Sequence, residues 1–252
     1  MAYKHPEFTT DQLVRRMADI REVENVMAKH AYLHGLKKNA EEFDTIWCKK
    51  APNPHFAQNQ GYYIGYDLLK ATYRDGCGLM TNMATQQMKK MYPELAGKSD
   101  EELYGVGTII MHPLTTSIIE LAGDGETAKG MWYSPGQITE VGPSGPEAQW
   151  IWEKYGVDFI KEDGNWKIWH MHVCTDFCVP VGTSWTDGSK DAPLGAAGGT
   201  DVDGGPQVVG MDVLPPHNKA VATYKVYSKS QVPQDVPRIP EPYWTFSETF
   251  SY

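Results

Sequence analysis

Cysteine, clustered positive charge and long apolar runs are all scarce in this chain. Its four cysteines in 252 residues show no paired spacing, which excludes a disulfide-rich scaffold and favours a reducing environment. No Lys/Arg cluster of useful length accompanies the net charge of −9, so nucleic acid is not expected as a partner. No apolar run approaches the length of a membrane helix, and the N-terminus lacks a signal-peptide pattern. We therefore expect a cytoplasmic protein without a membrane partner.

A hydrophobic fraction of 41% and an aromatic fraction of 12% are sufficient for a sizeable core. We expect one domain over residues 1–180. Residues 181–252 form a Gly/Pro-rich extended tail, because turn formers dominate from about Pro180. A free tail would not expose its terminal aromatic residues to water, so we expect it to wrap along the domain or a neighbouring subunit. These residues are Tyr243, Trp244, Phe246, Phe250 and Tyr252.

Helical periodicity dominates the first third of the chain. Apolar residues recur at helical spacing over residues 9–38, and a shorter helix is expected over 40–49. The composition of residues 51–61 predicts a loop. A third helical stretch follows Gly65, with a break near Gly76 and Gly78, and ends at Pro93.

Strand signals dominate the second third. Residues 107–133 read as two strands joined by a turn at Gly123–Gly125, and the strands 150–161 and 166–177 are joined by a turn containing Asp163-Gly164. The segments at 74–106 and 134–149 look like additions to this core. Strict alternation in the last strand places one set of side chains on a common face: Trp166, Ile168, His170, His172 and Cys174.

This order of elements resembles the SnoaL-like branch of the nuclear transport factor 2-like superfamily over residues 12–178. The resemblance rests on IREVENVMAKHAYLHGL (20–36), Ile64-Gly65, IIELAGDGETAKGMWY (118–133) and VDFIKEDGNWKIW (157–169). It implies an α+β cone, in which helices close one face of a strongly curved antiparallel sheet over an apolar cavity. Family members include dehydratases, isomerases, cyclases and other lyases, usually without metal or cofactor, and some members only bind ligands.

His112 matches the pocket histidine of that family, which implies a catalytic or ligand-contacting role. From the residues alone, a core histidine bonded to a neighbour is the commoner case. The resemblance also implies a tyrosine on the first helix that donates to a substrate oxygen, and Tyr32 is the one available there. His30 and His34 share a helix face. Where many dehydratases of the family carry an acid, this chain has Gly35 and Lys37, so a His–Asp dyad does not transfer directly.

His170, His172 and Cys174 form a row that is compatible with metal ligation, but the family is normally metal-free. We expect no metal and no cofactor, and assign His170 a catalytic role with His112 and Tyr32. Asp158 and Asp44 are the acids that could orient a histidine. The predicted substrate-binding set is His30, His34, Trp47, Phe56, Tyr62, Met131, Tyr133, Trp152, Tyr155, Asp158 and His172.

These residues predict a cofactor-independent lyase that dehydrates, or cleaves by a retro-aldol-type C–C fission, a bulky apolar oxygenated substrate such as a phenolic or polycyclic compound. His112 would remove a proton, and Tyr32 or a second histidine would stabilise the developing oxyanion. The alternatives are an isomerase or cyclase of the same substrate class, a non-catalytic binder of hydrophobic ligands, and a metal enzyme built on the His170–Cys174 row. We also expect a homo-oligomer, with a dimer favoured.

Overall fold

The computed structural model describes residues 7–187 and 214–252. Its first helix, α1 (Thr10–Gly35), begins at a capping box in which the Thr9 side chain accepts from the Gln12 backbone and the Gln12 side chain accepts from Thr9. Its inner face buries Val23, Val26 and Met27. The helix predicted over 9–38 is therefore present and ends three residues early.

The remaining helices continue the sequence order. α2 (Asn39–Ile46) is followed, after two strands, by α3 (Tyr66–Leu69), a π-helical segment (Lys70–Gly76) and α4 (Cys77–Met91). The predicted break near Gly76 is thus a change from π to α geometry within one helical path. Short 3₁₀ turns lie at Pro93–Leu95, Trp185–Asp187 and Phe246–Glu248.

The strands form one curved, open sheet in the order β3-β5-β6-β7-β1-β2-β8, with β4 also paired to β5. Their bounds are β1 (His55–Gln58), β2 (Gly61–Ile64), β3 (Ile109–Met111), β4 (Thr115–Leu121), β5 (Thr127–Gly142), β6 (Gly145–Glu162), β7 (Asn165–Pro180) and β8 (Lys219–Ala220). β1 pairs parallel to β7 while its other neighbours are antiparallel, so the sheet is mixed. The fold is α+β with a curved sheet, as the sequence predicts, but the expected antiparallel sheet is mixed because β1 joins the edge of β7 in the parallel sense.

Two segments expected to be irregular are strands. His55–Gln58 falls in the predicted loop, but it joins the edge of β7, a pairing between residues far apart in the chain. Residues 134–149, expected to be an addition to the core, form the far ends of β5 and β6 and their hairpin turn. Gly136 serves this packing, because a Cβ there would lie 2.6 Å from the carbonyl oxygen of Met111 on β3. Proline and glycine content is therefore a misleading signal in both segments.

A β-bulge changes the facing of β7. Asp158 pairs with His170 and Phe159 with Ile168, so Trp169 is an extra residue on β7. Trp166 and Ile168 consequently pack in the main core, whereas His170 and His172 lie on the opposite face. Strict alternation predicts that Trp166 and Ile168 share a face with His170 and His172, and this prediction is wrong.

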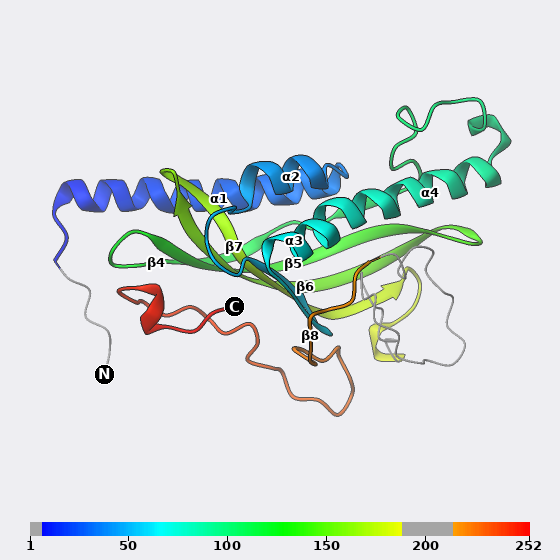
Figure 1. The fold of residues 1–252 in the computed structure, drawn as a ribbon. Helices are drawn as coiled ribbons and strands as arrows, with labels where there is room; N and C mark the ends of the chain where they lie inside the picture. Colours follow the sequence, from blue (N-terminus) through cyan, green and yellow to red (C-terminus); the bar gives the residue numbers. More distant parts are fainter. Residues whose placement is uncertain (1–6, 188–213) are drawn as a thin grey trace.

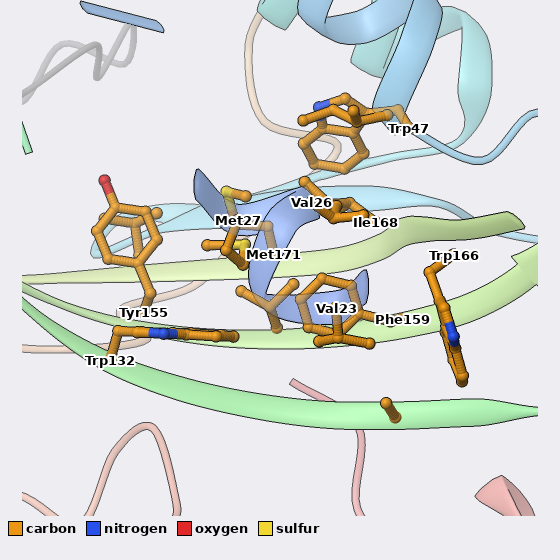
Figure 2. Packing of buried hydrophobic residues seen from close by; sticks show 14 of the residues in the cluster. Val23, Val26, Met27, Trp47, Trp132, Tyr155, Phe159, Trp166, Ile168 and Met171 are labelled. Atoms are coloured by element: carbon orange, nitrogen blue, oxygen red, sulfur yellow. The ribbon is translucent and has the colours of Figure 1, made fainter. Parts of the chain in front are cut away.

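The helices and the tail cover opposite faces of the sheet. In Figure 1, α1, α2 and α4 lie along one face, and the tail from β8 onward runs along the other, whereas Leu214 lies against Gly76 of the π-helical segment. The main core lies between α1, α2 and the sheet. Figure 2 shows Val23 and Met27 of α1 among Trp132, Phe159 and Met171 of the strands.

The aromatic end of the tail packs on the outer face of its own sheet. Tyr243 and Trp244 carbonyls accept from Gly123 and Asp124, and Tyr243 and Tyr252 are buried. Residues 188–213 of the predicted Gly/Pro-rich tail lie outside the described residues. Across 7–187 and 214–252, none of the helices combines the length and apolar character that a membrane span requires.

Candidate active site

A cavity of about 220 Å³ lies between the helices and the concave face of the sheet. Its apolar walls come from Phe56, Ile110, Ile138, Met171 and Val173, which strands β1, β3, β5 and β7 supply. The polar groups that face it come from α1, the π-helical segment, β2, β5, β6 and the connection between β3 and β4. Pockets of this kind, apolar with a few placed polar groups, are the usual form of a small-molecule site.

His112 occupies a break in the sheet edge. β3 ends at Met111 and β4 begins at Thr115, and both pair with β5. Pro113 cannot donate to a ladder, so the edge strand is interrupted just after His112. The buried His112 side chain faces the cavity, where its Nδ1 lies 2.9 Å from Glu153 Oε2. The two atoms are close but are not aligned for a hydrogen bond.

Glu153 is held in place from both sides. Its Oε2 accepts from the Tyr155 hydroxyl at 3.2 Å, and its Oε1 accepts from the Thr175 hydroxyl at 3.2 Å. Burial, reinforced by the charge of Glu153 and the hydrogen bond to it, raises the pKa of Tyr155 well above its ordinary value. Tyr155 therefore stays protonated and donates to the carboxylate. The fixed carboxylate lies beside the His112 imidazole, where its negative charge favours the protonated form of the ring.

His34 faces His112 from α1, with ring centroids 5.7 Å apart. Burial, with the nearby His30, His112 and Lys37, lowers the pKa of His34 well below its ordinary 6.5, so His34 is neutral near pH 7. Its Nδ1 lies 3.1 Å from the Asn39 amide nitrogen, which is a donor. Nδ1 therefore accepts, and the proton of the neutral ring sits on Nε2. His34 is thereby prepared as a neutral hydrogen-bond donor.

A second histidine–carboxylate pair lies beside the first. His30 Nδ1 is 2.7 Å from Glu42 Oε1, and the Tyr73 hydroxyl donates to the same oxygen at 2.7 Å. His30 stacks on His34 with centroids 5.6 Å apart. Three histidines thus line one wall between two buried carboxylates, Glu42 and Glu153.

Besides His112 Nδ1, three buried polar atoms of the cavity wall have no hydrogen-bond partner within the described parts of the chain. They are His30 Nε2, the Tyr63 hydroxyl and Thr72 Oγ1. An unpaired buried polar group costs about 1–3 kcal/mol. A ligand that carries oxygen atoms would satisfy them. Lys37 and Glu140 add two ionisable groups to the lining, and burial lowers the pKa of Lys37 and raises that of Glu140.

Five residues of the predicted site line the cavity together: His30, His34, Phe56, His112 and Tyr155. The others lie elsewhere. Trp47 is part of the core, and Tyr62 lies on β2 beside His55 on the outer face. Met131, Tyr133 and Trp152 also do not line the cavity, and the last two are exposed.

Tyr32 does not reach the cavity. It is 76% exposed, because it lies two positions from both His30 and His34 on the opposite side of the helix. The structure instead brings the tyrosines Tyr73 and Tyr155 to the cavity wall. The prediction that Tyr32 of α1 faces the cavity is therefore wrong.

His170, His172 and Asp158 form a separate cluster on the outer face, because of the bulge at Trp169. Asp158 accepts from His170 Nδ1 at 2.8 Å and is ion-paired to the fully buried Lys129. Ser251 Oγ and the Tyr252 backbone N–H donate to the same carboxylate, each at 3.0 Å. This cluster anchors the tail and is closed to the cavity. Within the residues that the structure describes, no group of three or more ligating side chains could hold a metal ion.

Glu153 and Glu42 were missed from the sequence. Glu153 is a lone acid among aromatic residues of a predicted strand, the same signal that drew attention to Asp158. Glu42 stands next to Phe43 in the first turn of α2, where acids are common at the surface. Neither position indicates that its partner lies on another element. Asp44, considered as an orienting acid, instead pairs with Arg74 at the surface.

The fold and cavity together define a class, that of α+β domains whose helices enclose a ligand-sized chamber against a curved sheet. The sequence model of the SnoaL-like domain matches residues 15–172, more than half of the chain, and the chain belongs to this family. A comparison with curated proteins finds no match.

Several solved structures are similar in fold. Hexachlorocyclohexane dehydrochlorinase LinA-type3 from Novosphingobium barchaimii LL02 is 13% identical, with a TM-score of 0.43 over 68% of this chain and 95% of that one. An NTF2-like protein with a cystatin-like fold from Novosphingobium aromaticivorans is 13% identical, with a TM-score of 0.39 over 68% and 92%. A protein of unknown function from Mycobacterium tuberculosis, Rv3472, is 14% identical, with a TM-score of 0.42 over 66% and 76%.

Proposed function

We propose that the chain is a cofactor-independent lyase that acts by general acid/base catalysis on a bulky, apolar, oxygenated substrate such as a phenolic or polycyclic compound. The observation that carries this proposal is the His112–Glu153 pair, at 2.9 Å, facing a cavity that also presents His34. One base, one donor and a largely apolar enclosure are what elimination and retro-aldol cleavage both need.

His112 acts as the base. The Glu153 carboxylate beside Nδ1 keeps the ring proton on that nitrogen, so the lone pair on Nε2 is available. When Nε2 takes a proton, the carboxylate stabilises the imidazolium that forms. The misalignment of the pair without ligand is compatible with this role, since catalytic hydrogen bonds tighten when substrate binds.

In a dehydration, His112 removes the proton from carbon, the electron pair forms the C=C bond, and the C–O bond breaks. The departing hydroxide takes up the proton that His112 removed and leaves as water, which returns His112 to its neutral form. In a retro-aldol cleavage, His112 removes a hydroxyl proton, a C=O bond forms, the C–C bond breaks and the carbanion takes up that proton. In both, His34 Nε2–H donates to the oxygen that gains charge.

The proposal is tested with a panel of phenolic and polycyclic alcohols and β-hydroxy ketones, with products identified by mass spectrometry. We expect a product lighter than the substrate by water or by a carbonyl fragment. A product with the same mass as the substrate would indicate an isomerase or cyclase instead of a lyase. A ligand that co-purifies and is never turned over would replace it by a binding protein.

A matched pair of histidine variants locates the base. His112→Ala should lower kcat by roughly 10²–10⁴-fold, the contribution of one general base, with an unchanged circular dichroism spectrum. His172→Asn, a buried histidine on the outer face of the sheet, should keep the native rate. A native rate in His112→Ala would remove the assignment of His112.

A further inference from the structure

A groove of about 670 Å³ shares His112 with the cavity as a lining residue. Its walls are one face of α1, with Ala28, Ala31 and Tyr32, and the β3–β4 edge, with Met111 and Leu114. Ile110 and His112 border both the groove and the cavity. The residue proposed as the base therefore borders both hollows.

The break in the edge strand creates this arrangement. Residues 112–114 separate β3 from β4, and the register with β5 shifts between Thr115 and Ile118. Thr116 has a φ of 54°, in the left-handed region that is costly for a β-branched residue. On the other wall, Gly35 lets α1 approach closely, because a Cβ there would lie 2.9 Å from the Ile110 carbonyl oxygen. Unusual backbone on both walls thus shapes the groove beside His112.

The cavity is too small to hold the whole of the proposed substrate. A cavity of roughly 150 Å³ accommodates one benzene ring. The cavity of about 220 Å³ therefore takes about one ring with its substituents, which is less than the bulky substrate proposed above. The remainder of such a molecule has to lie outside the cavity, and the groove adjoins the reacting position.

The chemistry of the groove favours an apolar occupant. Tyr32, Leu36 and Met111 are 76%, 63% and 49% exposed, so three large apolar side chains gather at one opening. The charged residues of the groove, Arg21 and Glu24, pair with one another at 3.0 Å. No net charge therefore opposes an apolar group.

We propose that the groove is a second substrate subsite, so that an elongated substrate places one apolar end in the cavity, the other in the groove, and its reacting carbon at His112. This inference rests on the proposed function, and it also gives Tyr32 a place at the substrate, as part of the outer subsite. It narrows the substrate class to molecules with an apolar unit on each side of the oxygenated reacting centre.

The test uses 4-alkylphenols, from methyl to hexyl, as binding probes for the native protein and two variants. Ala28→Trp fills part of the groove from an exposed position of α1. Ala18→Trp is the matched control, an exposed alanine of the same helix that does not line the groove. Dissociation constants are measured by titration calorimetry.

In the native protein and in Ala18→Trp, each methylene that enters the groove should tighten binding about fourfold, as expected for burial of one CH₂. In Ala28→Trp this increment should vanish while the affinity for 4-methylphenol stays unchanged. The proposal is overturned by equal increments in all three proteins, by the absence of any increment in the native protein, or by a failure of the probes to bind. Increments that respond to Ala28→Trp, together with no turnover across the substrate panel, would refute the lyase alone.

Discussion

Replacing Glu153 by Gln should disable His112 without disturbing the cavity. Gln has nearly the same shape, so its carbonyl can still accept from the Tyr155 hydroxyl, and its amide can donate to Thr175 Oγ1. What disappears is the negative charge whose oxygen lies 2.9 Å from His112 Nδ1. The variant therefore isolates the electrostatic contribution of the carboxylate to the protonated imidazole.

The expected loss of kcat follows from the distance between His112 and Glu153 and from the burial of both side chains. Both side chains are almost fully buried, with 6% and 4% of their surface exposed, so screening by solvent is weak. Charges roughly 4 Å apart interact by about 4 kcal/mol at an effective dielectric constant of about 20. If the transition state carries the imidazolium, kcat should fall by about 10³-fold.

The assay compares kcat with the affinity for 4-methylphenol, a neutral probe that does not need the base. We expect kcat to fall and the affinity to stay within about twofold, because only the charge has changed. Glu147→Gln, an exposed acid on the same strand, is the matched control and should retain native kcat. A native kcat in Glu153→Gln, with the substrate turned over, would refute the role of the carboxylate.

The remaining predictions concern the cluster on the outer face. Asp158→Asn should destabilise the fold by about 3–5 kcal/mol, because it leaves the fully buried Lys129 without its counter-charge, whereas Asp163→Asn in the exposed pair with Lys50 should cost about 1 kcal/mol or less. Urea denaturation measures both, and equal losses would refute the burial argument. Stability should also depend on pH. Burial alone raises the pKa of Asp158, but the hydrogen bond from His170 and the charge of Lys129 outweigh this effect. The pKa of Asp158 therefore lies below its ordinary value of 3.8. The stabilisation is then complete above about pH 4 and is lost as pH falls through the folded pKa, so the native protein and Asp158→Asn should converge in stability only in that range. A constant difference between pH 7 and pH 2 would contradict this.

Features encoded by neighbouring residues could be predicted from the sequence. The hairpin at Asp163-Gly164 and the turn at Gly123–Gly125 follow from local turn chemistry, and the structure has both. His112, His30 and His34 were predicted to face a common cavity, and the structure places all three on its wall. Their catalytic roles stay predictions.

Features that depend on contacts between distant segments could not be predicted from the sequence. Glu153 lies 41 positions after His112 and meets it only because β6 and the β3–β4 break both border β5. The bulge at Trp169 carries no local signal, and it moves His170 and His172 to the outer face. Tyr32 was placed by analogy, and a shift of two positions on a helix turns a side chain to the other side. Tertiary pairing decided the Glu153–His112 contact and the bulge, whereas the facing of Tyr32 follows from the helix geometry of α1.

The tail has a consequence for the order of folding. Lys129, Asp158, His170 and His55 pair in register across β5, β6, β7 and β1 and form a polar row on the outer face. Phe246, Phe250 and Tyr252 cover Lys129 with ring centroids 4.7–5.0 Å from its Nζ. The β5–β6 and β6–β7 hairpins that bring Lys129, Asp158 and His170 together are local, whereas His55 lies 115 positions from His170 and Ser251 lies 93 positions from Asp158. The three hairpin strands can therefore pair while Lys129, Asp158 and His170 are still hydrated, and water leaves these charges only in a later step, when the tail closes its long loop onto them.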